Sequence, residues 1–91
     1  MHVVASPVAR LNRLVAVSMA DGPADAYAQL DELEDALGDY PYFHAARADL
    51  LRRLDRPGAA RAAYERAREL STNPRQRAAL ARSAAELGAG E

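Results

Sequence analysis

Hydrophobic residues recur along this chain at spacings of three and four, the interval that places side chains on one face of an α-helix. The first such stretch follows Ser6-Pro7 and stops before Gly22, and a second restarts at Pro23 and stops before Gly38. Serine caps helix N-termini, proline suits the first turn, and glycine ends helices. The pattern therefore predicts one helix on each side of Gly22.

Three more hydrophobic stretches follow, and each is opened by a proline. These prolines are Pro41, Pro57 and Pro74, and Asn73 adds a capping side chain ahead of the last one. The stretches keep helical spacing, and short polar or glycine-containing segments separate them. The chain is therefore expected to form five helices joined by short turns.

The two halves of the chain repeat each other at an interval of 34 residues. Aligning residues 7–36 with residues 41–70 gives six identities, and the turns fall at matching places. The identical pairs are Pro7/Pro41, Arg13/Arg47, Asp21/Asp55, Pro23/Pro57, Ala26/Ala60 and Ala28/Ala62. This is the interval of the tetratricopeptide repeat, a unit of two antiparallel helices.

We therefore expect an all-α domain: a right-handed superhelix of two tetratricopeptide-like hairpins and a C-terminal capping helix. Repeat one covers residues 7–37, repeat two covers residues 41–71, and the capping helix covers residues 74–88. In such arrays each unit packs on its neighbours, and the last helix covers the apolar edge of the final hairpin. The close helix contacts of repeat two are assigned to Ala48, Ala60, Ala67 and Tyr64.

Two further packing roles follow from the pattern. Leu14 and Val17 are expected to pack inside the first hairpin. Four consecutive or nearly consecutive residues form an aromatic cluster, which we interpret as a plug between the two hairpins, with a peptide-docking spot as the alternative. These residues are Tyr40, Tyr42, Phe43 and His44.

Composition supports a helical fold and shows an uneven charge. The 91 residues include 22 Ala and 12 Arg, both strong helix formers, and no Lys, Cys or Trp. Residues 1–39 sum to −5 and residues 40–91 to +4. Such a chain could bind a second copy or a charged partner, or simply carry two solvated faces of opposite sign. It lacks the basic excess typical of nucleic-acid binders.

Candidate chemistry is sparse. His2 and His44 lie far apart with no Cys or paired carboxylates nearby, so no metal site is expected. The acidic run Asp31–Asp35 is interpreted as a solvated helix face. Neither a glycine-rich phosphate loop nor a nucleophile beside a base is recognisable, and we expect no enzyme activity and no cofactor. No signal peptide or membrane span is predicted, and a cytoplasmic location is expected.

The inner, concave side of stacked hairpins is the usual ligand surface of such arrays. By repeat register, its partner-binding candidates are Val8, Leu11, Val15, Met19, Tyr42, Asp49, Arg52, Arg53 and Arg82. Ser18, Ala45 and Arg75 are expected on the same side. One end of this surface is apolar and the other basic. The alternative is that the apolar end packs under N-terminal residues such as Val3 and Val4.

Two segments resemble a known family. They are "SPVARLNRLVAVSMADGP" (residues 6–23) and "FHAARADLLRRLDRPGAARAAYERARELSTNPRQRAALARSAAEL" (residues 43–87). The chain resembles the C-terminal tetratricopeptide-like extension of bacterial extracytoplasmic-function sigma factors over nearly its whole length. Where that family usually has glycine after the leucine of "LLRRL", this chain has Asp55.

The resemblance implies a protein-interaction and regulatory domain that supports transcription initiation. Its partners would be upstream sigma domains, RNA polymerase or a regulatory protein. DNA contact would belong to upstream sigma regions that are not in this sequence, so an excised domain is favoured over a stand-alone relative. The alternatives are a stand-alone adaptor, or a helical module that contacts nucleic acid through its Arg-rich second half. A homodimer also remains open.

Overall fold

The computed structural model is all-helical. It describes residues 6–89, apart from the side chains of Met19, Asp21 and residues 88–89. Within this range there are six helices and no strand. The helices are α1 (Pro7–Asp21), α2 (Pro23–Asp31), α3 (Glu34–Leu37), α4 (Pro41–Arg53), α5 (Pro57–Leu70) and α6 (Pro74–Ala89).

The predicted helix starts are confirmed at both capping side chains. Ser6 Oγ accepts a hydrogen bond from the Ala9 backbone N–H at 3.1 Å. Asn73 Oδ1 accepts from the N–H groups of Arg75 at 2.9 Å and Gln76 at 3.3 Å. Each cap satisfies backbone donors that a helix leaves unpaired at its first turn.

The predicted helix after Gly22 is interrupted, which is why the described residues hold six helices rather than five. A turn at Glu32-Leu33 separates α2 from α3, and the Leu33 N–H donates to the Leu30 carbonyl at 2.9 Å. This i to i−3 bond is tighter than an α-helical one. The turn coincides with the acidic run from Asp31, where carboxylates three and four residues apart repel each other on a regular helix.

The turn between α4 and α5 uses a left-handed backbone conformation. Asp55 has φ of 62°, and it is the one non-glycine residue with positive φ in the described part of the chain. Aspartate tolerates this region better than most residues with a side chain. The Arg56 N–H donates to the Leu51 carbonyl at 2.9 Å and closes the end of α4. The turn therefore forms without a glycine at this position.

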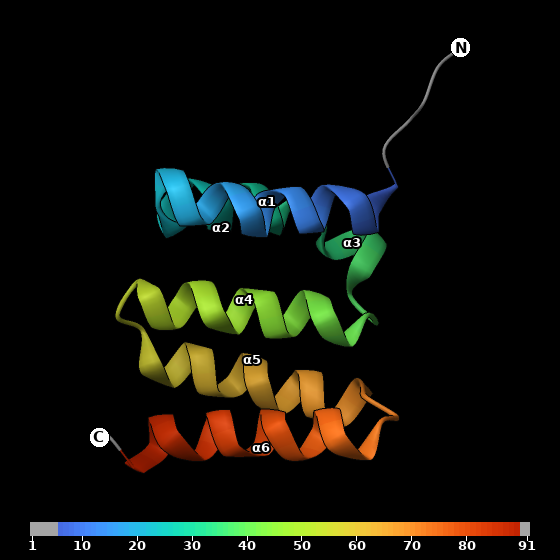
Figure 1. Ribbon diagram of the computed structural model, residues 1–91, viewed down its shortest axis with the longest axis vertical. Helices are drawn as coiled ribbons and strands as arrows, with labels where there is room; N and C mark the ends of the chain where they lie inside the picture. The colour runs from blue at the N-terminus through green and yellow to red at the C-terminus, as the bar shows by residue number, and fades with distance from the viewer. Residues whose placement is uncertain (1–5, 90–91) are drawn as a thin grey trace.

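Along the long axis of the molecule, α1 and α2 overlap at one end, and α4, α5 and α6 follow in turn towards the other end (Figure 1). Helix α1 packs on α2, α2 on α4, α4 on α5, and α5 on α6. Helix α4 therefore lies at the centre and contributes to two hydrophobic clusters. The first cluster contains Leu11, Leu14, Ala26, Leu30, Leu33, Leu37, Phe43, Ala46 and Leu50. The second contains Ala48, Leu51, Ala60, Ala63, Tyr64, Ala67, Leu80 and Ala84.

Phe43 joins α4 to the first three helices. Its side chain is completely buried in the first cluster, whereas Tyr40 is 37% exposed. The expected aromatic plug is thus Phe43, and its edge-to-face contact with His44 lies at a centroid distance of 5.1 Å. Ala48, Ala60, Ala67 and Tyr64 are all buried, in agreement with their predicted packing roles.

One packing assignment in the first hairpin is wrong. Val17 was expected inside it, but its side chain is 36% exposed. The buried positions of α1 are Leu11, Leu14 and Ser18, which fall three, four and seven residues apart on one helix face. The inner face of α1 is therefore rotated away from Val17, and Ser18 is the last buried residue on that face.

Candidate protein-interaction surface

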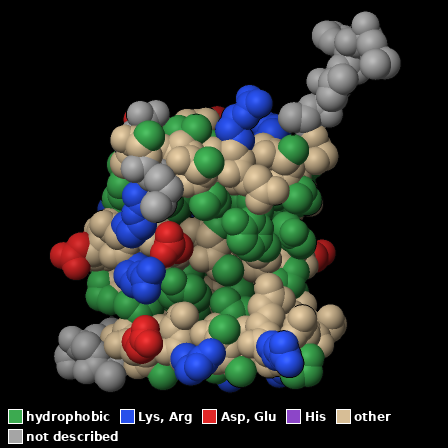
Figure 2. All heavy atoms as spheres, viewed as in Figure 1, with side chains coloured by type: hydrophobic (Ala, Val, Ile, Leu, Met, Phe, Trp, Pro, Cys, Tyr) green, Lys and Arg blue, Asp and Glu red, His purple; other side chains and the backbone are tan. Residues whose placement is uncertain are grey.

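A groove of about 200 Å³ lies between α1 and α4. Its lining residues come from the middle of α1 and from successive turns of α4. They are Val15, Tyr42, Ala45, Ala46 and Asp49. Figure 2 shows hydrophobic side chains gathered between these two helices on the face turned to the viewer. Three predicted candidates, Val15, Tyr42 and Asp49, are thus brought together in one groove.

The groove exists because two alanine side chains of α4 are too short to fill the space beside Val15 and Tyr42. Ala45 and Ala46 form the floor of the groove, and the partly buried side chains of Val15 and Tyr42 lie beside them. The Tyr42 ring is braced by Tyr40 in an edge-to-face contact at a centroid distance of 6.2 Å. The arrangement suits a partner's apolar side chain, because a preformed hollow needs little reordering on binding.

A charged end adjoins this apolar groove. The Arg52 guanidinium donates to the Asp49 carboxylate at 2.8 Å. Burial raises the pKa of Tyr64 above its ordinary value; the charge of Arg52 opposes this, and the carboxylates of Asp49 and Glu86 add to it.

Arg53 was expected to bind a partner, but it makes its contacts within the chain. Its Nη1 donates to Ser18 Oγ at 3.0 Å, and its Nη2 donates to the Ser18 carbonyl at 2.7 Å. That carbonyl lies in the last turn of α1, where a cation is favoured by the helix dipole. Arg53 therefore ties the C-terminal end of α1 to α4 and holds one side of the groove in place.

Other candidates lie away from the groove. Leu11 was expected on the concave surface, but it is completely buried in the first cluster and cannot contact a partner. The reason is the rotated inner face of α1 described above. Val8 is 37% exposed in the first turn of α1 and does not line the groove. The side chain of Met19, and the residues Val3 and Val4, lie outside the described part.

Arg52 and Arg82 differ in position although both are exposed. Arg52 lies at the charged end of the groove through its contact with Asp49. Arg82 follows the buried Leu80 by two residues, and so it points to the opposite side of α6. It therefore does not line the groove.

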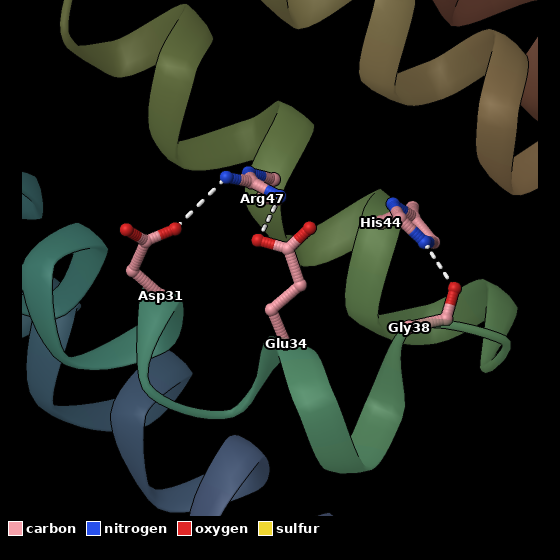
Figure 3. Close-up of polar contacts among 5 residues, drawn as sticks. All are labelled: Asp31, Glu34, Gly38, His44 and Arg47. Atoms are coloured by element: carbon pink, nitrogen blue, oxygen red, sulfur yellow. Dashed lines mark hydrogen bonds and ion pairs between the residues drawn. The ribbon is translucent and has the colours of Figure 1, made fainter.

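A polar network on the other side of α4 was missed at the sequence level (Figure 3). Arg47 reaches from α4 to Asp31 at 3.0 Å and Glu34 at 3.4 Å. His44 lies 2.7 Å from the Gly38 carbonyl, which accepts a hydrogen bond from its Nε2–H. A Cβ at Gly38 would come within 2.9 Å of the Glu34 carbonyl oxygen, so a larger residue there would force the backbone to shift. The opposite charges of Asp31–Asp35 and Arg47 were the only sequence feature that could have indicated these ion pairs.

These contacts change the picture of the basic half. Arg47, Arg52 and Arg53, three of the arginines considered for nucleic-acid contact, are bonded to groups within the chain. Among the described residues, no group of three or more metal-binding side chains occurs. No helix in that part of the chain has the length and apolar character needed to cross a bilayer.

Comparison with known proteins finds a relative of part of this chain. No protein-family model and no solved structure matches the chain. A segment of 68 residues is 47% identical to an uncharacterized protein of Rhizobium meliloti (strain 1021). The match covers 75% of this chain and 16% of that relative, so the chain corresponds to a small part of a much longer protein.

Proposed function

We propose that this chain is a tetratricopeptide-like interaction domain that receives a protein partner on the surface formed by α1 and α4. The observation that carries the proposal is the groove between α1 and α4, with an apolar floor and a charged end. The 34-residue interval and the successive packing of neighbouring helices support the tetratricopeptide-like superhelix.

The biological setting we propose rests on the family resemblance. The chain is a regulatory C-terminal domain of an extracytoplasmic-function sigma factor, acting in the cytoplasm. Its partner is an upstream sigma region, RNA polymerase or a regulatory protein, and promoter DNA is contacted elsewhere in the full protein. The matched segment is a minor part of the Rhizobium relative, as expected for an accessory module attached to larger domains.

The groove by itself supports weak binding. Burying one large apolar side chain contributes about 1.5–3 kcal/mol, which is less than the cost of holding two molecules together. Additional contacts are therefore needed, and Asp49 with Arg52 lies next to the groove to supply them. Half-exposed ion pairs contribute little affinity but favour the correct orientation of a partner.

The test compares two valines on the same helix. Val15→Glu places a carboxylate in the groove, whereas Val17→Glu places one on an exposed position outside it. In a pull-down with the sigma factor regions and polymerase, we expect Val15→Glu to reduce partner recovery at least tenfold and Val17→Glu to leave it unchanged. Tyr42→Ala, which removes a groove wall without adding charge, should also reduce recovery.

Thermal melts are needed to establish that each variant is folded, because Val15 and Tyr42 also pack against the first cluster. Equal recovery with folded Val15→Glu, Tyr42→Ala and wild-type protein would rule out the groove as the binding site. A partner that proves to be DNA, with affinity falling steeply as salt rises, would instead support the nucleic-acid alternative.

A further inference from the structure

A second pocket, of about 180 Å³, is bounded by α1 and α2. Its lining residues are Arg10, Arg13, Leu14 and Gln29. It shares no residue with the groove between α1 and α4. Arg10 and Arg13 are three residues apart and therefore neighbours on one side of α1. In Figure 2, basic side chains stand at the end of the molecule where α1 lies.

The two arginines lie close together without a carboxylate partner. Within residues 6–89, neither Arg10 nor Arg13 takes part in an ion pair, whereas Arg47, Arg52, Arg61 and Arg66 each do. The pocket therefore gathers two positive charges that have no carboxylate within ion-pair distance among the described residues.

The position of Arg10 adds to this charge. It lies in the first turns of α1, where the helix dipole is positive, and no acidic residue occurs in the first turn. A cation here is unfavourable in the absence of an anion. Local arrangements that lower stability and are not compensated by other contacts tend to occur at functional positions. The neighbouring Gln29 amide offers two further N–H donors from α2.

We infer that this pocket binds a phosphate group. Each guanidinium can donate two parallel hydrogen bonds to a pair of oxygens, and a tetrahedral phosphate has enough oxygens to engage both arginines and the Gln29 amide. A carboxylate has only two oxygens and one charge, so it matches this set of donors less well. Leu14 is 8% exposed and lines the pocket with an apolar side chain. It therefore adds no acceptor that would compete with the anion for the three donor groups.

The test measures the melting temperature in tens of millimolar inorganic phosphate, with sodium chloride matching the ionic strength in the reference. A ligand that binds the folded state raises its melting temperature. We expect a rise of several degrees for the wild-type chain and none for Arg10→Gln/Arg13→Gln. Arg75→Gln, which removes an exposed arginine of α6 outside the pocket, should keep the full rise.

Gln29→Leu provides a variant of unchanged charge and should reduce the rise. The double Arg variant should melt no lower than wild type in chloride, because it removes like charges near the positive end of α1. Glycerol phosphate, run in parallel, separates a free ion from a phosphate carried on a small molecule, and a rise with either ligand supports the site. No rise with both ligands, or an equal rise in all variants, would overturn the inference.

Discussion

Phe43→Ala is expected to lower the free energy of unfolding by about 3–5 kcal/mol. Phe43 is the largest fully buried side chain in the described part of the chain, and it links α4 to the cluster formed with α1, α2 and α3. Truncation removes this contact and leaves a cavity that rigid helices cannot close fully. A domain of 91 residues has a total stability of about 5–14 kcal/mol, so the loss is a large share of the total.

Urea unfolding followed by circular dichroism measures this loss, and Tyr40→Ala is the matched control. Tyr40 lies three residues earlier and is 37% exposed, so its truncation should cost less than about 1 kcal/mol. If both variants lost the same small amount, Phe43 would not be the residue that joins α4 to the first three helices.

Ala60→Leu is expected to destabilise the chain by about 1–3 kcal/mol. Ala60 is completely buried in the second cluster, which α4, α5 and α6 share. A larger side chain there forces α5 away from its neighbours, because close-packed interiors accommodate extra methylene groups poorly.

Ala28→Leu is the control for this substitution, since Ala28 occupies an exposed position on α2. Thermal melts of the two leucine variants should differ clearly, with Ala28→Leu close to wild type. An Ala60→Leu variant as stable as the control would mean that α5 does not approach its neighbours as closely as the structure shows.

Helix locations were largely predictable from the sequence because prolines, capping residues and glycines mark the ends locally. Ser6 and Asn73 cap the helices that they were expected to cap, and α1, α4 and α5 begin at the predicted prolines. The all-helical class followed from the same local signals together with the alanine and arginine content.

Features that depend on contacts between helices were predicted less well. The burial of Leu11 and the exposure of Val17 depend on how α1 rotates against its neighbours, and a repeat register carries no information about that rotation. Ser18 is fully buried, and its polar groups are bonded to Arg53, 35 residues away. Such a pairing leaves no local signal in the chain.

The candidate site shows the same division. Val15, Tyr42 and Asp49 were placed on a common surface by the repeat register, and they line one groove. Ala46 also lines it but was not singled out, since a small residue in an alanine-rich helix does not stand out. The pocket between α1 and α2 was not anticipated, because Gln29 comes from a different helix than the two arginines.

The central claim, that the groove between α1 and α4 receives a protein partner, is tested most directly by photo-crosslinking within the full-length protein. A photoreactive phenylalanine derivative is placed at Tyr42, in the groove, or at Ala28, on the exposed side of α2. Our account predicts a discrete crosslink to a sigma region, polymerase or a regulatory protein from position 42 and none from position 28. Identical crosslinking from both positions, or none from position 42 in an active protein, would contradict it.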